Sequence, residues 1–180
     1  LLKQSDSTSL ILIDGCQNSD YISIVNKLDP ELKNAKPGAA ALENLPLLKN
    51  IIHIGPKRQR GMFQWSDLYK MADSVSDEAL SQAQAGLSPN EVISIQYTSG
   101  TTGFPKGVML THNNIVNTGR LIGERLNFRS SDTLCIPVPF FHCFGYILGV
   151  MACVSHAVAM VPLVSFQPVQ VMQALEAEKC

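Results

Sequence analysis

Apolar and polar positions follow two different periods along the first half of the chain. Continuous apolar runs at 9–14 and 51–55 are typical of strands, the first of a buried parallel strand. Residues 21–28 place apolar side chains at helical spacing, and the segments 65–71 and 77–85 also favour short helices. This succession of strand, helix and strand predicts an α/β fold, a layered sheet with flanking helices, rather than a sandwich or a helical bundle.

The same patterns continue in the second half. Residues 91–96 alternate between apolar and polar, as in a half-buried strand, and the apolar run 108–110 predicts another strand. Thr111 is a suitable N-cap for a helix over 113–126. Further elements are predicted as strands at 133–136 and 158–161 and as a helix over 167–178.

A long stretch without charge, residues 133–167, raises the question of a membrane span. Its prolines, its two histidines and its strand-like ends argue against one. We interpret it instead as a core helix over about 141–154, buried between strands. Gly145 and Gly149, four residues apart, would let that helix approach a neighbour closely.

Composition narrows the class of partner. The net charge is −1 and 16% of residues are charged, which gives no reason to expect nucleic acid as a partner. The five scattered cysteines contain no C-x-x-C pair, so we expect reduced, mostly buried thiols and a cytoplasmic protein, although a targeting segment upstream would not be seen here. Three basic residues within 56–61 indicate only a solvated loop, and His53 within a strand favours a core histidine over a catalytic one.

The stretch 97–107 is the most distinctive part of the sequence. It holds three glycines, four serine or threonine hydroxyls and Lys106, between two predicted strands. Such a loop offers backbone N–H groups and hydroxyls to a polyphosphate, and the lysine adds a point charge. It is not a Walker A loop, because Gly107 rather than Ser or Thr follows Lys106 and no helix comes next, and it lacks a G-x-G-x-x-G fingerprint.

A second cluster, 137–145, directly follows the strand at 133–136. Two prolines carry the chain away from the strand end, where open α/β sheets bind ligands. Its aromatic residues also suit a core, with His142 as a satisfied histidine. A nucleophilic pair of His142 and Cys143 is disfavoured, because side chains adjacent in sequence diverge at a helix start.

Residues 97–107 resemble, position by position, the phosphate-binding signature of the acyl-adenylate-forming (AMP-binding) enzymes, among them acyl-CoA synthetases and luciferases, and 137–145 is similar to their P-x-x-F-H-x-x-G segment. The resemblance implies a two-step reaction: a carboxylic acid, most simply a fatty acid, attacks ATP to give acyl-AMP, and coenzyme A then displaces AMP. It implies that Thr98 contacts Mg²⁺ and ATP and that Phe141 and His142 line the acid site. The other phosphate-loop positions it implies are Ser99, Gly100, Thr101, Thr102, Gly103 and Lys106.

The resemblance also implies that residues 1–180 are a fragment of the large N-terminal domain, without the C-terminal domain. The chain begins without methionine and stops inside a helical pattern, in keeping with that interpretation. We therefore assign no catalytic residue within it and expect this piece alone to be inactive. An aryl-acid ligase, a luciferase-like enzyme and a non-catalytic nucleotide-binding module remain alternatives. Peripheral membrane contact of the whole protein and its oligomeric state are left open.

Overall fold

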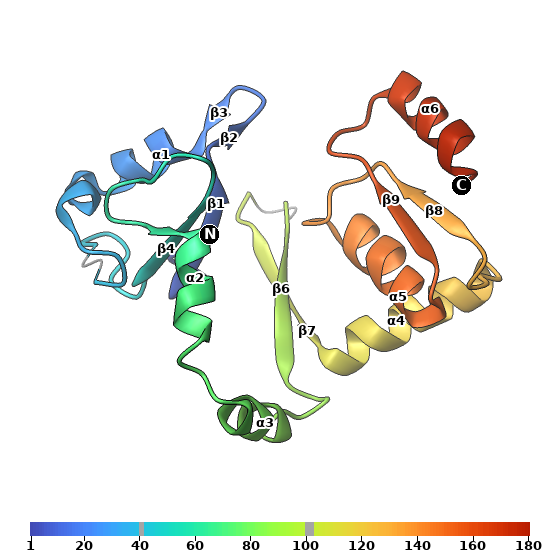
Figure 1. The fold of residues 1–180 in the computed structure, drawn as a ribbon, viewed down its shortest axis with the longest axis horizontal. Coiled ribbons are helices and arrows are strands. Elements are labelled where there is room, and N and C mark those ends of the chain that lie inside the picture. Colours follow the sequence, from blue (N-terminus) through green and yellow to red (C-terminus); the bar gives the residue numbers. More distant parts are fainter. Residues whose placement is uncertain (40–41, 100–102) are drawn as a thin grey trace. The chain divides into compact units, whose positions relative to one another are not determined.

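The chain folds as two compact units, Leu1–Gly86 and Leu87–Cys180. The computed structural model describes residues 1–39, 42–99 and 103–180 (Figure 1). Each unit combines strands with flanking helices, so the predicted α/β class is confirmed. Membership of a single large N-terminal domain stays a prediction.

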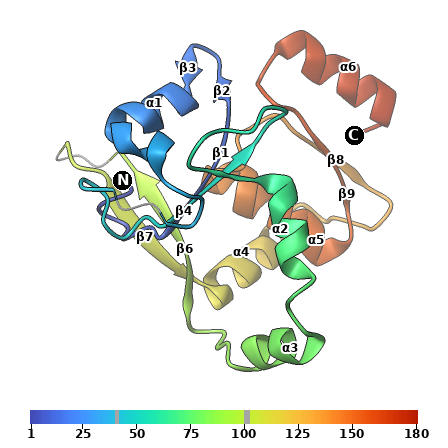
Figure 2. The same ribbon diagram turned by 60° about the vertical axis from the view of Figure 1, so that its left-hand side comes forward.

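A parallel sheet organises the first unit. Its strands are β1 (Ser9–Ile13), β4 (Asn50–Ile54) and β5 (Phe63–Gln64), in the order β1-β4-β5, and β1 and β4 lie side by side (Figure 2). Both predicted strands are therefore confirmed. Burial on both faces holds for the middle of β4 but not for β1, where Ile11 and Ile13 are exposed.

Capping residues define the helices of this unit. Helix α1 (Tyr21–Leu28) begins at Asp20, whose Oδ1 accepts the Ser23 N–H at 2.8 Å. The 3₁₀ helix η1 (Pro30–Asn34) follows, and β2 (Gly15–Cys16) pairs with β3 (Ser19–Asp20) as a small hairpin. The hydrophobic core of the unit consists of Leu12, Val25, Leu32, Leu42, Leu48, Ile51 and Met62.

His53 is fully buried in β4. Its Nε2 lies 3.0 Å from Asp14 Oδ1, just beyond the end of β1. Gly55 lies against the same ring, so closely that an added Cβ would come within 2.4 Å of His53 Cε1. The prediction of a core histidine is confirmed.

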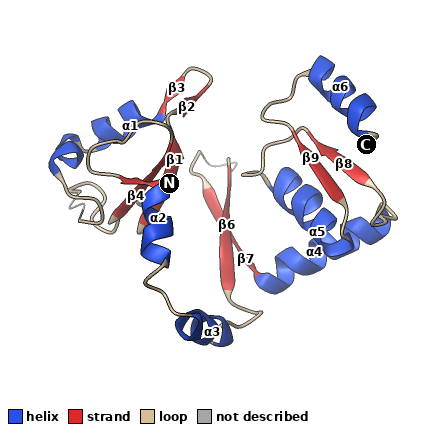
Figure 3. Ribbon diagram, in the orientation of Figure 1, coloured by secondary structure: helices blue, strands red, loops and turns tan. Residues whose placement is uncertain are grey.

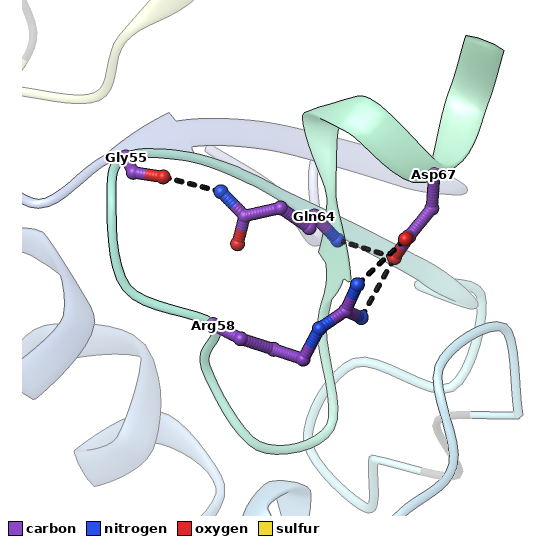
Figure 4. Close-up of polar contacts among 4 residues, drawn as sticks. All are labelled: Gly55, Arg58, Gln64 and Asp67. Atoms are coloured by element: carbon purple, nitrogen blue, oxygen red, sulfur yellow. Dashed lines mark hydrogen bonds and ion pairs between the residues drawn. The ribbon is translucent and has the colours of Figure 1, made fainter.

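The basic segment 56–61 is a solvated loop, as predicted, with Lys57, Arg58 and Arg60 all exposed, and it is also anchored at Arg58. Arg58 donates to both carboxylate oxygens of Asp67, at 2.8 and 2.6 Å, at the start of α2 (Trp65–Ala72) (Figure 4). The same carboxylate accepts the Gln64 N–H at 2.9 Å, and the Gln64 side-chain amide donates to the Gly55 carbonyl. The Arg58 hydrogen bond, aided by the Gln64 N–H, lowers the pKa of Asp67 from 3.8 to about 2.

Strands and helices also alternate in the second unit. The hairpin of β6 (Val92–Thr98) and β7 (Lys106–Thr111) leads directly into α4 (His112–Arg125), as Figure 3 shows. Thr111 caps α4 as predicted, its Oγ1 accepting the Asn114 N–H at 3.2 Å. A separate parallel pair is formed by β8 (Thr133–Ile136) and β9 (Ala159–Pro162), and α6 (Pro168–Glu178) ends the unit. Helix α3 (Asp77–Ala85) precedes this unit.

The uncharged stretch forms a helix, as predicted, but over 144–156 rather than about 141–154 and with different packing. It begins at Phe144 as the π-helix η2 (Phe144–Met151) and continues as α5 (Ala152–His156). Rather than lying between strands, it packs on α4, where Gly119 faces Met151 and Gly123 faces the His156 ring. The predicted close approach is confirmed at Gly149, where an added Cβ would lie 3.2 Å from Ile136.

Within residues 1–39, 42–99 and 103–180, no helix is long and apolar enough to cross a membrane. All five cysteines lie in these ranges and are free, as expected. Only Cys153 is buried, however, so the expectation of mostly buried thiols is wrong. Burial raises the pKa of the Cys153 thiol.

Substituting Asp67→Asn should loosen the start of α2. The depressed pKa of Asp67 means that its carboxylate stabilises the fold above about pH 3.8 and that this contribution is lost as the pH falls through about 2. Amide exchange of residues 65–72 in the whole protein should therefore be faster in Asp67→Asn than in wild type at pH 5, and the difference should shrink toward pH 2. A difference that does not depend on pH would contradict this account.

Substituting Gly119→Ala should destabilise the α4 contact. The new Cβ would lie 2.8 Å from Met151 Cβ and 2.9 Å from the Met151 carbonyl carbon, so backbone must move, at a cost of about 1–3 kcal/mol. Gly86→Ala is the matched control, because its nearest contact would be 3.6 Å, an ordinary van der Waals distance. Urea unfolding of the two variants should separate them; equal midpoints would show that α4 is not closely packed.

Candidate functional site

The β6–β7 hairpin presents the described members of the predicted phosphate-binding set at its turn end. Thr98 is the last residue of β6 and pairs in register with Lys106, the first residue of β7. Both residues are exposed, as is Ser99. Neither the side chain of Thr98 nor that of Lys106 has a hydrogen-bond or ion-pair partner among the described residues, so a hydroxyl and an ammonium group are available on paired positions.

The turn between these strands requires glycine at one described position. Gly103 has a φ of +83°, a conformation that residues with a Cβ rarely adopt, and an added Cβ would meet nothing within 4 Å. The turn is therefore open to solvent at this point. Gly100, Thr101 and Thr102 lie outside the described residues, so their predicted roles stay predictions.

A second set of candidate residues lies between β8 and η2. Phe141 is 84% exposed, and His142 and Cys143 beside it are also exposed. His142 Nδ1 accepts the Phe144 N–H at 3.1 Å and thus caps the start of η2. A neutral His142 ring consequently carries its proton on Nε2, which is left to donate outward.

The contact between His142 and Cys143 corrects one argument from the sequence. Cys143 Sγ lies 3.7 Å from His142 Nδ1, so the two side chains do not diverge. The same nitrogen already accepts the Phe144 N–H, however, and an imidazole nitrogen has one lone pair. His142 is therefore poorly placed to take a proton from the thiol.

Next to this segment, α4, β8 and η2 enclose an apolar groove of about 550 Å³. Its volume lies in the range of small-molecule sites. Apolar side chains from the three elements and from the segment after β9 form most of its wall, together with Arg125. The principal apolar residues are Ile122, Leu126, Leu134, Ile136, Phe144, Leu148 and Phe166.

The sequence did not single out this groove. Ile122 and Leu126 are apolar residues of the predicted helix 113–126, and nothing in the sequence pattern distinguishes a helix face that lines a groove from one that is buried. Phe144 links the groove to the predicted site, because its N–H binds His142 and its side chain lines the groove.

Metal-binding capacity in the described part of the chain is limited. No group of three or more His, Cys, Asp or Glu side chains gathers there. The Thr98 hydroxyl is an exposed oxygen of the kind that Mg²⁺ accepts, and Mg²⁺ is commonly held by few protein ligands together with substrate phosphates. Thr98 therefore fits as one ligand of a shared site.

Comparison with known proteins decides the family. A family model described as AMP-binding enzyme matches residues 1–180. The chain belongs to the AMP-binding enzyme family. The resemblance inferred from residues 97–107 and 137–145 is thus confirmed.

Individual relatives agree with this assignment. The chain is 52% identical over 180 residues to "Putative acyl-CoA synthetase YngI" of Bacillus subtilis (strain 168), covering all of this chain and 33% of that protein. It is 35% identical over 167 residues to the "Medium-chain acyl-CoA ligase ACSF2, mitochondrial" of Danio rerio, covering 91% of this chain and 27% of the relative. The chain thus spans about a third or less of the length of these curated relatives.

Two solved structures share the fold. An anthranilate CoA ligase, AuaEII, in complex with anthranoyl-AMP matches with a TM-score of 0.72 and 21% identity, over 97% of this chain and 30% of that one. A long-chain-fatty-acid-CoA ligase (FadD1) from Archaeoglobus fulgidus matches with a TM-score of 0.67 and 20% identity, over 99% and 29%. At these identities the likeness establishes the fold alone.

The His142 cap can be tested by substitution. His142→Ala removes the acceptor of the Phe144 N–H, whereas His142→Asn keeps an oxygen near the position of Nδ1. Loss of a cap is worth about 1 kcal/mol, so the Phe144 amide should exchange roughly fivefold faster in the alanine variant. Amide exchange of the whole protein measures this. If alanine and asparagine variants exchange at the wild-type rate, His142 does not cap the helix.

Proposed function

We propose that the whole protein activates a carboxylic acid with ATP and transfers the acyl group to coenzyme A. The observation that carries this proposal is the exposed end of the β6–β7 hairpin, where Thr98 and Lys106 face each other beside a turn open to solvent. The names of the relatives, acyl-CoA synthetase and acyl-CoA ligase, support the reaction class.

In the first step, a carboxylate oxygen of the acid attacks the α-phosphorus of ATP, and the bond to the β-phosphate oxygen breaks to release pyrophosphate. The Lys106 ammonium offsets the negative charge that builds on the departing phosphates, as a point charge with donors free to rotate. The Thr98 hydroxyl oxygen would be a ligand of Mg²⁺, or the hydroxyl would donate its hydrogen to a phosphate oxygen. When bound, Mg²⁺ supplies Lewis-acid neutralisation of phosphate charge.

In the second step, the thiol of coenzyme A gives up its proton to solvent, its sulfur forms a bond to the acyl carbon, and AMP leaves with the electrons of the mixed-anhydride C–O bond. No described residue acts as a covalent nucleophile in this scheme. His142 and Phe141 are assigned to the entrance of the acid site, where the Nε2–H of a neutral His142 can donate to a carboxylate oxygen.

The apolar groove favours an aliphatic acid. Its walls from α4, β8 and η2 present side chains that gain by burying alkyl groups, about 0.8 kcal/mol for each methylene removed from water. Phe144 connects the groove to the segment of His142, so a chain lying in it would place its carboxylate toward that segment. A fatty acid is therefore the substrate class we propose. An aryl-acid ligase is the alternative, and benzoic acid as a substrate distinguishes the two.

Lys106→Ala and Thr98→Ala in the whole protein should each slow acid-dependent exchange of pyrophosphate into ATP, on the order of 10-fold to 100-fold, because each removes a group that stabilises phosphate charge. Lys106→Arg, which keeps the charge, should lose less. Both side chains are exposed and lack partners within the described residues, so the thermal midpoint should not change. Unchanged exchange in both alanine variants would remove the hairpin from the mechanism.

A further inference from the structure

Arg125 is the one charged residue among the described residues that line the apolar groove. It lies in the last turn of α4, and every other lining residue is apolar, a glycine or a cysteine. It forms no hydrogen bond or ion pair with another residue in the described part of the chain. Arg120, one and a half turns earlier on the same helix, instead pairs with Glu124 and does not line the groove. The guanidinium of Arg125 is thus available to a ligand.

The position of Arg125 along the groove follows from the chain path. From the end of α4, a short connection over 126–132 leads into the start of β8, whereas the segment of His142 leaves from the other end of that strand (Figure 1). The groove therefore runs along β8, with Arg125 near its first residues and Phe144 beyond its last. The four residues of β8 span about 13 Å at about 3.3 Å each.

This length matches a chain of moderate size. With C–C bonds of about 1.5 Å, an extended saturated chain advances about 1.25 Å per carbon, so roughly ten carbons reach from one end of β8 to the other. An acid with its reactive carboxylate near His142 would then bring its far end to Arg125. A methyl group there would cover a guanidinium without offering it an acceptor, which is unfavourable. A carboxylate would accept two parallel hydrogen bonds from it.

We propose that Arg125 is a specificity-determining residue that selects acids of about ten carbons carrying a second carboxylate at the far end. This inference rests on the proposed function, because it names the substrate class of the same site. Charge complementarity favours a substrate of this kind. The wall of the groove is apolar along its length, and the one charged side chain among its described lining residues is cationic. Because Arg125 is exposed, solvent screens the ion pair, and we expect an effect nearer tenfold than a thousandfold.

The test compares decanedioic acid with decanoic acid as substrates of the whole protein, by kcat/KM for pyrophosphate exchange. Arg125→Leu should lower kcat/KM for the diacid about tenfold and raise that for the monoacid, because the methyl end then meets an apolar side chain. Arg125→Lys should retain part of the preference as a point charge. Arg120→Leu is the matched control on the same helix and should leave the ratio of the two acids at its wild-type value. Added salt should reduce the wild-type preference for the diacid.

The outcomes separate this inference from the function on which it rests. If Arg125→Leu changes kcat/KM for both acids by the same factor, or for neither, Arg125 does not bind the far end of the substrate and the inference is wrong. If the wild-type protein forms no acyl-adenylate from either acid or from shorter and longer monoacids, the proposed function fails instead. If acyl-adenylate still forms but the ratio of kcat/KM for the diacid to that for the monoacid is the same in Arg125→Leu and wild type, only the present inference is overturned.

Discussion

The close contact between α4 and the η2–α5 helix is the constraint on which the second unit depends. Gly119 brings the backbone of α4 against Met151, Gly123 leaves room for the His156 ring, and Gly149 brings η2 against Ile136 of β8. Interiors pack as densely as organic crystals, so such contacts fix helix positions within fractions of an ångström. The wall of the apolar groove and the start of η2, where His142 binds, are consequences of that packing.

Local patterns were sufficient for most of the secondary structure. Asp20 and Thr111 cap helices because their side-chain oxygens accept backbone N–H groups. This interaction can be predicted from the sequence alone. The features that the sequence did not predict depend on distant residues. The Arg58–Asp67 pair spans nine positions and a loop, and the exposure of Ile11 and Ile13 depends on what covers one face of β1.

The residues of the candidate site likewise divide into those that the sequence predicts and those that it does not. The hairpin residues could be located from the sequence, because glycine, hydroxyl and lysine positions in fixed order are a property of the chain itself. The groove could not, since Leu134, Leu148 and Phe166 are ordinary apolar residues whose shared wall exists only after folding. Arg125 carried no signal either: an arginine in the last turn of a helix is expected from the helix dipole alone.

Two glycines of the second unit are required for opposite reasons. Gly103 needs a positive φ but has empty space around it, whereas at Gly119 neighbouring atoms exclude any side chain. Asparagine tolerates the left-handed region better than most residues and is thus the least costly replacement at position 103. Size, in contrast, is the barrier at position 119, where even one methyl group is too large. Related sequences can therefore carry asparagine in place of Gly103. Gly119, in contrast, can be replaced only if the facing helix changes as well.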